Sequence, residues 1–384
     1  MEKLGILMLS DSFYPVRGGR EMVIDKLMTE FMGKIDAKLI CPRFKKHKSF
    51  DDNNLPYMVE RCDSINITKN EVLSVVKRKQ KKQIEADIVS GKYKILHVQT
   101  KYGLMKYALK LKKKYGVSVL TSVHTNYQAV YKKTLRVPFL YWFAVKRIKK
   151  ILNRVDKITT VSNFMKGELE KLGVRVPIEV IPNGNNFANA YVGDDDIKKI
   201  NDLYGWQDDE NILIFIGRLC KAKSIEVILK SLQYLKSAYK MVFIGGGETE
   251  EYSRIAKSLN VAKNCHFVGQ INDANILRAV CARASLQVFP SVTETFGMTI
   301  PECGAVGTPS IVTENMATAE FIKDGFNGYI TDGSPEVIGR KIDEVLSDKA
   351  NLKIVSMNAK KTMCLTWSDI AERYISLYKS MVAC

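Results

Sequence analysis

Two glutamates, Glu294 and Glu302, lie eight positions apart on either side of a glycine. The apolar run from Ala284 to Phe289 predicts a strand, Gly297 predicts a tight turn, and Pro301 suits the first turn of a following helix. A strand, a turn and a helix N-terminus together present backbone N–H groups to an anion. Carboxylates beside such an anion can accept hydrogen bonds from hydroxyl groups. The stretch therefore predicts a site for a phosphate flanked by hydroxyls, as in a nucleotide sugar.

Two cations, Arg218 and Lys223, lie on a loop that follows the strand-like run Asn211 to Ile216. An arginine can fork onto phosphate oxygens and a lysine adds a point charge, although ordinary surface cations are the alternative. His124 follows the strand-like run Val117 to Val123. A histidine at the carboxyl end of a strand lies on the ligand side of an open sheet. The alternative is a structural histidine with satisfied hydrogen bonds.

Two weaker candidates lie near the ends of earlier strands. The pair Gly18-Gly19 follows the predicted strand Leu4 to Leu9 and would let the backbone approach a ligand, but a plain turn is an equal alternative. His97 lies near the end of the predicted strand Ile95 to Val98, and a structural role is favoured for it.

The run Glu294-Thr-Phe-Gly-Met-Thr-Ile-Pro-Glu302 resembles the signature of retaining glycosyltransferases of the GT-B fold, family 4. The resemblance covers nearly the whole chain; it is strongest from 217 to 328 and weakest from 44 to 89. It implies an α/β protein with two Rossmann-like, doubly wound domains facing a cleft. Residues 1–188 would bind the acceptor and 189–366 the nucleotide sugar. The last helix, Trp367 to Met381 within 367–384, would cross back to the first domain.

The resemblance also implies a reaction. A hexose would move from a nucleotide diphosphate sugar, with UDP-glucose favoured, to a hydroxyl group with retention of configuration, without metal or cofactor. Arg218 and Lys223 would neutralise the leaving diphosphate, Glu294 would orient sugar hydroxyls, and Glu302 would hold the ribose. No carboxylate is a clear nucleophile, so we expect same-face attack, with His124 hydrogen-bonded to the sugar. The predicted catalytic residues are Glu294, His124, Arg218 and Lys223; the predicted donor-binding residues are Gly18, Gly19, Gly217, Arg218, Lys223, Gly269, Glu294, Phe296, Gly297, Met298, Thr299 and Glu302.

Two positions depart from the family pattern. Ser224 stands where glycine is usual, which should alter the helix start more than the chemistry. Asn185-Asn186 stand where an apolar residue and aspartate are usual, so no function is assigned to them.

Composition limits the other possibilities. A chain of 384 residues with 46% hydrophobic residues suggests two to three domains with buried cores. No apolar run reaches a membrane-spanning length, and the first residues have the wrong flanks for a secretory signal. The 8 cysteines form no Cys-x-x-Cys pair, which indicates a reducing cytoplasm and no zinc site.

The formal charge of +18 is concentrated in the first half of the chain. Residues 88–155 contain 16 Lys and Arg and no Asp or Glu. A surface with one sign of charge indicates an anionic partner such as a membrane leaflet, an acidic polymer or nucleic acid.

Local patterns predict the elements around this basic region. Asn70 to Val89 reads as one helix with a basic cluster, for which a solvated face is the alternative. Tyr127 to Arg136 reads as a loop, and it resembles acceptor-side loops of family members that glycosylate diacylglycerol. The polar stretch ending at Asp209 reads as the interdomain linker.

Pro138 to Val155 is predicted to be a two-faced helix. The arc expected to face the core carries Leu140, Tyr141, Ala144, Val145, Ile148, Ile151, Leu152 and Val155. The opposite arc carries Lys146, Arg147, Lys149, Lys150, Arg154, Phe139, Trp142 and Phe143. Aromatic residues among cations on an outward face are typical of a membrane-interface contact, and packing under a neighbouring loop is the alternative. The predicted membrane or acceptor residues are Trp142, Phe143, Lys146, Arg147, Lys149 and Lys150.

The acceptor is the least determined part of the prediction. A membrane lipid such as diacylglycerol or a glycolipid is the leading hypothesis, and a polysaccharide or a lipid-linked glycan is the alternative. A sugar-sensing or nucleic-acid-binding protein that retains the fold is the alternative from another class. The presence of both glutamates with Arg218 and Lys223 disfavours it, so no nucleic-acid partner is expected. We expect a cytoplasmic, peripheral membrane enzyme on the inner-leaflet side, bound to an anionic membrane surface.

Overall fold

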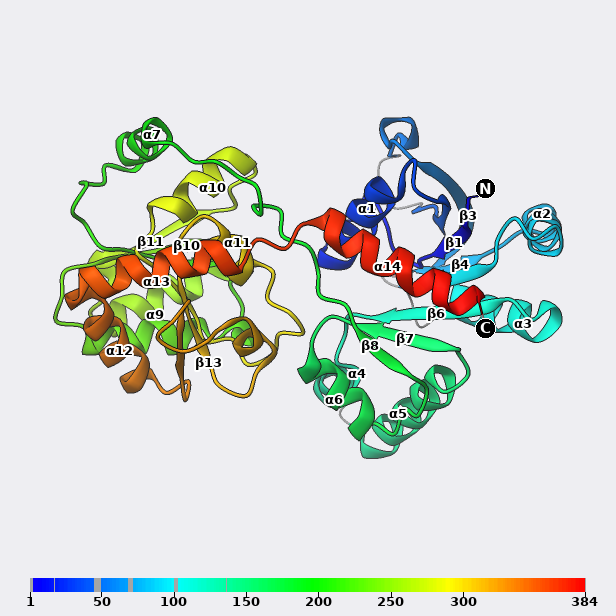
Figure 1. The fold of residues 1–384 in the computed structure, drawn as a ribbon. Helices are drawn as coiled ribbons and strands as arrows, with labels where there is room; N and C mark the ends of the chain where they lie inside the picture. The colour runs from blue at the N-terminus through cyan, green and yellow to red at the C-terminus, as the bar shows by residue number, and fades with distance from the viewer. Residues whose placement is uncertain are drawn as a thin grey trace. The chain divides into compact units, whose positions relative to one another are not determined.

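The chain divides into two compact units in a computed structural model, which describes residues 3–16, 18–44, 50–67, 72–99, 103–135 and 137–383 (Figure 1). The first unit comprises Met1–Asn183 and Trp367–Cys384, and the second comprises Gly184–Thr366. The change of unit after Asn183 falls a few residues before the boundary expected at 188. The functions expected of the two domains stay predictions.

The first unit is built on an eight-stranded sheet with the order β4-β3-β2-β1-β5-β6-β7-β8. Its strands are β1 (Gly5–Leu9), β2 (Asp36–Pro42), β3 (Met58–Asn66), β4 (Val72–Val75), β5 (Ile95–Val98), β6 (Ser118–Val123), β7 (Lys157–Thr160) and β8 (Ile178–Val180). All neighbouring pairs are parallel except β3 and β4. The strand order reverses direction between β1 and β5, and ligands of open α/β sheets bind at such a point.

Helices cover both faces of this sheet, so β1 and β5 are buried along their whole length. The helices of the first unit are α1 (Gly19–Phe31), α2 (Arg78–Val89), α3 (Gly103–Tyr115), α4 (Tyr127–Thr134), α5 (Pro138–Leu152), α6 (Asn163–Lys171) and α14 (Trp367–Val382), with a 3-10 turn at Asp52–Asn54. Helix α14 packs beside α1, with the rings of Phe31 and Tyr378 5.8 Å apart (Figure 1).

The second unit has a fully parallel six-stranded sheet with the order β11-β10-β9-β12-β13-β14. Its strands are β9 (Ile212–Ile216), β10 (Lys240–Ile244), β11 (Cys265–Gly269), β12 (Leu286–Phe289), β13 (Ser310–Thr313) and β14 (Tyr329–Thr331). Its helices are α7 (Asp194–Tyr204), α8 (Ile225–Ser231), α9 (Thr249–Ser258), α10 (Ala274–Arg283), α11 (Thr299–Ala305), α12 (Pro335–Ser347) and α13 (Lys349–Thr362), with 3-10 turns at Lys221–Lys223, Leu232–Tyr234, Ala262–Asn264 and Ala317–Phe321. The order reverses between β9 and β12, so each unit is doubly wound, as predicted.

The helix predicted over Asn70 to Val89 is wrong in its first part. Val72–Val75 forms strand β4, antiparallel to β3, and α2 begins only at Arg78. Residues 70 and 71 lie outside the described chain. Burial alternates along β4, with Val72 and Ser74 buried and Leu73 and Val75 exposed. Pairing with β3 therefore decides the conformation of a segment that is too short to show a helical period.

Two further predictions are corrected. Most of the loop predicted at Tyr127 to Arg136 is helix α4, which Asn126 caps by accepting a hydrogen bond from the Ala129 N–H at 3.0 Å; Arg136 lies outside the described chain. The polar stretch ending at Asp209 is not a free linker. It contains α7, and its side chains Phe187, Ile200 and Trp206 are buried in the second unit's core.

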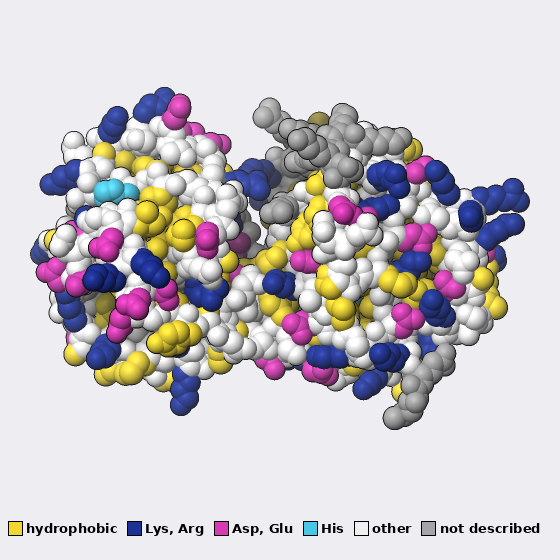
Figure 2. Space-filling model, turned by 90° about the horizontal axis from the view of Figure 1, so that it is seen from above, with side chains coloured by type: hydrophobic (Ala, Val, Ile, Leu, Met, Phe, Trp, Pro, Cys, Tyr) yellow, Lys and Arg dark blue, Asp and Glu magenta, His cyan; other side chains and the backbone are white. Residues whose placement is uncertain are grey.

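Charged side chains of both signs are interspersed on the face shown in Figure 2. Mixed charges of this kind are ordinary for a soluble surface. Within the described chain, none of the helices combines the length and apolarity needed to cross a bilayer.

Candidate functional site

The structure brings together two of the predicted catalytic residues of the second unit. Glu294 lies on the loop after β12, and Lys223 lies on the loop after β9. The Lys223 ammonium forms an ion pair with Glu294 Oε1, and the Ser291 hydroxyl donates to the same oxygen at 3.2 Å. The two side chains remain 25% and 14% exposed, so both can still meet a ligand.

The two loops that carry this pair are also joined by hydrogen bonds from side-chain hydroxyls of one loop to a backbone carbonyl of the other. The Thr293 hydroxyl donates to the Ala222 carbonyl at 2.7 Å, and the buried Ser291 hydroxyl reaches the same carbonyl at 3.3 Å. The Lys223–Glu294 pair is therefore positioned by its surroundings before any ligand arrives. Positioning of this kind is what preorganised electrostatic catalysis requires.

A cavity of about 520 Å³ lies at the carboxyl ends of β9 and β10 in the second unit, and Gly217, Arg218 and Gln270 line it. The Gly217 N–H donates to the Ile244 carbonyl at 2.9 Å, and the Gly245 N–H donates to the Gly269 carbonyl at 2.8 Å. Gly245 has φ +140°, and a Cβ there would lie 2.0 Å from the Gly217 carbonyl oxygen. Only glycine fits so close a crossing of backbones, which keeps the cavity open to a ligand.

The walls of this cavity combine chemically different surfaces. Arg218 is exposed and supplies a cation, whereas Ile216, Ile271 and Leu277 supply apolar surface. A planar base would fit against the apolar residues while phosphates meet the cation. Glu294, Glu302 and Lys223 do not line this cavity.

Glu302 lies in the first turn of α11 and accepts a hydrogen bond from the Asn186 side-chain amide at 2.7 Å. Asn185 next to it is buried, and its amide donates to the carbonyls of Pro301 and Met363, both at 2.6 Å. Sequence reasoning assigned nothing to Asn185 and Asn186. The structure shows that they hold α11 and the Glu302 carboxylate in place.

Burial raises the pKa of Glu302 to about 7, and the Asn186 hydrogen bond opposes this shift. Ribose hydroxyls that donate to the carboxylate would favour its charged form and lower this pKa. Donor binding should then release a proton below about pH 7. UDP-glucose affinity is expected to fall up to about tenfold per pH unit below that value and to level off above it. Calorimetric titration between pH 5.5 and 8.5 measures this directly.

The control for this prediction is Glu302→Gln, which keeps the shape but cannot titrate. Its UDP-glucose affinity should be weaker and should not follow this pH profile. A steep pH dependence that persists in Glu302→Gln would remove Glu302 from the donor site.

The residues between the two glutamates occupy different environments. Gly297 has φ +80°, which confirms the predicted turn. The Phe296 side chain is buried edge-on against Phe321, so only its backbone is available to a ligand. The Thr299 hydroxyl accepts a hydrogen bond from the Gln287 amide at 3.0 Å, and Met298 occupies the N-cap position of α11 without a capping side-chain hydrogen bond.

Ser224, where the family usually has glycine, adopts a left-handed conformation with φ +57° and ψ +34°. This conformation crowds a Cβ atom and disfavours L-residues by about 1–2 kcal/mol. Replacing Ser224 by Gly should therefore raise the free energy of unfolding by up to about 1 kcal/mol, after subtracting the greater freedom of an unfolded glycine. Urea denaturation measures the change.

A second serine provides the control. Ser253→Gly puts glycine into the interior of the right-handed helix α9 and should lower stability by about 0.5 kcal/mol. A Ser224→Gly protein that loses stability like Ser253→Gly would contradict the assignment of strain to Ser224.

His124 in the first unit follows β6 and ends a chain of hydrogen bonds that begins at α14. Its Nε2–H donates to Gln99 Oε1 at 2.9 Å, and Gln99 Nε2 lies 3.1 Å from His97 Nε2. His97 Nδ1 lies 2.7 Å from the Tyr378 hydroxyl, and its Nε2 lies 2.7 Å from Ser122. The arrangement fits a His97 that carries its proton on Nδ1. Sequence reasoning missed Gln99 and Tyr378, because each is one polar residue in an otherwise ordinary strand end or helix.

Both imidazoles are uncharged near pH 7. Burial lowers the pKa of His97 to about 3, assisted by His124. Burial also lowers the pKa of His124 to about 4, assisted by the nearby Arg20 cation. A neutral His124 can form hydrogen bonds but does not suit the role of a general acid, and its expected contact with the sugar stays a prediction. His97 is fully buried and structural, as favoured.

Gly18 and Gly19 lie where α1 begins, close to the carboxyl end of β1. Gly18 caps α1 and its carbonyl accepts from the Met22 N–H at 3.1 Å. The Glu21 carboxylate is nearly buried and forms an ion pair with Arg20 at 3.1 Å. It lies so close to Gly18 that a Cβ atom at that position would be 2.7 Å from a carboxylate oxygen. Arg17, next to this turn, lies outside the described chain.

Helix α5 presents the predicted aromatic residues to solvent. The exposed fractions are 75% for Phe139, 68% for Trp142 and 58% for Phe143, so the alternative of packing under a loop is not supported. Lys146 lies over the Trp142 ring at 5.7 Å. Leu140 was predicted to face the core, but it is 49% exposed. The buried residues of α5, Ile148 and Leu152, lie in the later turns, and the first turn of the helix is not packed against the core.

The candidate residues thus lie in both units. Gly18, Gly19, His124 and the α5 residues belong to the first unit, and the remaining candidates belong to the second. Within the described ranges no group of three or more His, Cys, Asp or Glu side chains could hold a metal ion. Metal independence stays a prediction.

Two doubly wound units with a returning C-terminal helix define the GT-B class of fold. Residues 196–362 match the family model of glycosyl transferases group 1, and residues 17–188 match that of glycosyltransferase family 4. The two matched ranges together span most of the chain, and the chain belongs to these group 1, family 4 glycosyltransferases. The family resemblance of the Glu294–Glu302 signature is confirmed.

Two individual proteins with similar sequences show the degree of relationship. The chain is 31% identical over 234 residues to an uncharacterized glycosyltransferase of Methanocaldococcus jannaschii, a match that covers 58% of this chain and 60% of that protein. It is 24% identical over 282 residues to the alpha-monoglucosyldiacylglycerol synthase of Acholeplasma laidlawii, covering 70% of each.

Solved structures share the fold. Anabaena HepE in complex with UDP superposes with a TM-score of 0.77 at 16% identity, covering 98% of this chain and 100% of that chain. The sucrose-phosphate synthase of Thermosynechococcus elongatus superposes with a TM-score of 0.77 at 18% identity, covering 99% of both.

Proposed function

We propose that this protein is a retaining hexosyltransferase that moves a hexose from a nucleotide diphosphate sugar to a hydroxyl group of a membrane lipid. UDP-glucose is the favoured donor and diacylglycerol the favoured acceptor. The observation that carries the lipid assignment is the surface of α5, where Phe139, Trp142 and Phe143 are exposed among lysines and arginines. Such a surface is typical of helices that lie in a membrane interface.

The donor assignment rests on the second unit. Its cavity combines apolar surface for a base with Arg218 for a phosphate, and the Lys223–Glu294 pair lies on neighbouring loops. The UDP and UDP-glucose complexes of Anabaena HepE support a uridine nucleotide donor by analogy. The two monoglucosyldiacylglycerol synthases among the relatives support a glucose donor and a diacylglycerol-based acceptor in the same way.

In the proposed reaction the bond between the anomeric carbon and the β-phosphate oxygen breaks first. Arg218 and Lys223 stabilise the negative charge that develops on the leaving diphosphate, and no metal ion is required for this step. The acceptor hydroxyl oxygen bonds to the anomeric carbon on the same face, and its proton passes to the leaving phosphate oxygen. Glu294 of the second unit holds sugar hydroxyls, and Glu302 holds the ribose. The neutral His124 of the first unit keeps its proposed role as a hydrogen-bond partner.

A glycan acceptor is the second candidate. The relatives include the lipopolysaccharide core glycosyltransferase LpsE of Rhizobium meliloti, 25% identical over 175 residues, and the putative glycosyltransferase EpsD of Bacillus subtilis, 23% identical over 292 residues. The exposed aromatic residues of α5 favour a membrane lipid over a glycan that is not attached to a membrane.

The direct test is incubation of the purified chain with UDP- and GDP-hexoses, with and without anionic liposomes that contain diacylglycerol. We expect a glycolipid, detected by mass, only with UDP-glucose and liposomes. Donor hydrolysis without glycolipid would reject the lipid acceptor. The absence of turnover with every donor would reject the transferase.

Attachment to the membrane can be tested separately from catalysis. Replacing Lys146, Arg147, Lys149 and Lys150 by Ser removes four cations from α5. At roughly 1 kcal/mol for each cation near an anionic leaflet, liposome affinity should fall about a thousandfold at most. Sedimentation with anionic liposomes measures the loss, and transfer to a soluble acceptor should change much less.

The matched control removes the same charge from α2 by replacing Arg78, Lys79, Lys81 and Lys82 with Ser. These cations are exposed on a helix without exposed aromatic residues. An equal loss of liposome binding in both variants would show that net charge alone acts and would contradict the role of α5.

A further inference from the structure

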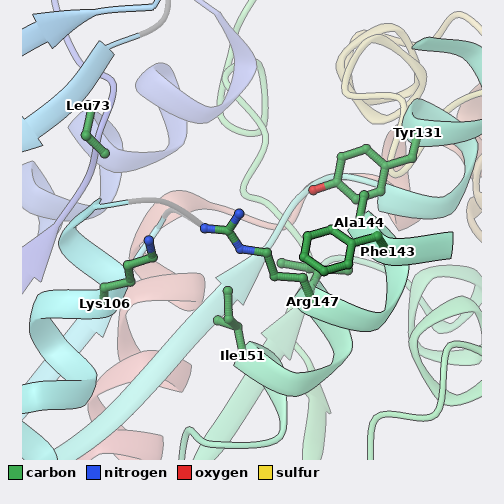
Figure 3. Close-up of a pocket in the computed structure, with 8 residues that line it drawn as sticks. Leu73, Lys106, Tyr131, Phe143, Ala144, Arg147 and Ile151 are labelled. Atoms are coloured by element: carbon green, nitrogen blue, oxygen red, sulfur yellow. The ribbon is translucent and has the colours of Figure 1, made fainter. Parts of the chain in front are cut away.

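A hollow of about 330 Å³ lies within the first unit, between β4, α3, α4 and α5 (Figure 3). Its apolar wall consists of Leu73 from β4 and Phe143, Ile148 and Ile151 from α5. These residues come from two segments that are far apart in the sequence. The distribution of charge along the sequence did not predict that the two segments lie together. The wall makes the hollow different from an ordinary basic surface, because it offers apolar contacts as well as charge.

Two cations from different helices also reach this hollow. Lys106 lies in the first turn of α3 and Arg147 lies in the middle of α5. Figure 3 shows the Arg147 guanidinium and the Lys106 ammonium directed into the same space, with the Tyr131 hydroxyl of α4 turned toward it. Among the described residues neither cation has an ion-pair partner, and residues 88–155 contain no Asp or Glu. Two convergent like charges, with no carboxylate among the described residues that line the hollow, favour binding of an anion.

The two halves of the hollow together describe an amphiphile. A phosphodiester can accept hydrogen bonds from an arginine fork and a lysine, and an acyl chain can cover Phe143, Ile148 and Leu73. The volume is near the lower end of the roughly 300–1,000 Å³ found for small-molecule sites, so it fits a headgroup and the start of one chain. Trp142 is exposed next to Phe143 on α5, so the remainder of the chain can stay in a membrane.

We propose that this hollow binds one anionic phospholipid, with its phosphate between Lys106 and Arg147 and its acyl chain against the apolar wall. The site would convert a general attraction to an anionic surface into recognition of a single lipid molecule. The proposal deepens the proposed membrane attachment of the first unit and does not depend on the identity of the donor or acceptor.

The test uses the full chain and monomeric lipids, so that membrane charge plays no part. Dihexanoyl phosphatidylglycerol is titrated below its micelle concentration, and binding is followed by calorimetry and by intrinsic tryptophan fluorescence, to which Trp142, Trp206 and Trp367 all contribute. Dihexanoyl phosphatidylcholine tests the need for net negative charge, and glycerol phosphate tests the need for the acyl chain. We expect saturable binding of phosphatidylglycerol and at least about tenfold weaker binding of the other two probes.

Two double variants separate the hollow from the surface charge. Lys106→Ser with Arg147→Ser should weaken phosphatidylglycerol binding at least about tenfold, because the phosphate loses two charge-assisted hydrogen bonds. Lys110→Ser with Lys113→Ser removes the same charge from exposed positions on α3, outside the hollow, and should have little effect. Ala144→Phe fills the hollow without changing charge and should also abolish binding.

Three results would overturn the proposal. Equal losses in the two double variants would leave only general electrostatic attraction. Glycerol phosphate that binds as tightly as phosphatidylglycerol would indicate a free-anion site without a lipid role. An oligonucleotide that competes fully with the lipid would indicate nucleic acid. UDP-glucose binding and turnover of the unmodified chain are measured in parallel. If the unmodified chain neither binds nor turns over the donor, the proposed enzyme is rejected, and the lipid site is still tested by its own binding data.

Discussion

Replacing Glu294 by Gln is expected to lower the rate of hexose transfer by about 10²- to 10³-fold while the fold stays intact. The carboxylate accepts hydrogen bonds from Lys223 and Ser291 in the second unit, and the proposed reaction needs it to accept from sugar hydroxyls as well. The amide can accept through one atom only and leaves Lys223 without its counter-charge. Both side chains are partly exposed, so solvent can compensate in the resting protein.

Initial rates of product formation, measured by mass, test this expectation. Glu314→Gln is the matched control, since Glu314 is an exposed carboxylate after β13 in the same unit, and it should retain full activity. Circular dichroism checks the fold of both proteins. A Glu294→Gln enzyme with normal turnover would refute the assignment of the active site.

Replacing Arg218 by Ala is expected to have a similarly large effect. The guanidinium is exposed at the cavity next to Gly217, and it is proposed to stabilise the diphosphate as the glycosidic bond breaks. Losing one such donor typically lowers turnover by about 10²- to 10³-fold. The loss should appear mainly in kcat, because the developing charge is greatest in the transition state.

Two variants sharpen this prediction. Lys221→Ala removes an exposed cation from the same loop and should leave turnover almost unchanged. Arg218→Lys retains the charge but not the planar fork, so partial recovery would indicate charge and no recovery would indicate bidentate contact. Equal activity in Arg218→Ala and Lys221→Ala would exclude a catalytic role for Arg218.

Strands and the donor signature could be predicted from sequence because their signals are local. The apolar runs that became β1, β9 and β12 have no competing helical period, and glycine at position 297 permits the positive φ that its tight turn adopts. The segment Val72–Val75 was misread because four residues carry too little pattern, and its pairing with β3 is a tertiary contact. Phe187 and Trp206 were passed over because single apolar residues in a polar stretch do not reveal what they pack against.

The residues of the candidate site were more predictable than their partners. Glu294, Lys223 and Glu302 stand in a family pattern, but the Lys223–Glu294 ion pair joins residues far apart in the chain. Asn186 and Gln99 lack any such pattern, since their hydrogen bonds to Glu302 and His124 join residues far apart in the sequence. Long-range polar contacts of this kind form only in the completed fold, so their partners cannot be recognised from one sequence alone.

The return of α14 to the first unit has a consequence for biosynthesis. Tyr378 supplies the hydroxyl beside the buried His97, yet it is translated only after the whole of Gly184–Thr366. At about 5–20 residues per second, the nascent first unit waits roughly 10–40 s with a polar group and an apolar face uncovered. Chaperones that bind nascent chains should therefore engage this protein during that interval. A premature stop codon before Trp367 should give a product that proteases remove quickly, even though both sheets are complete.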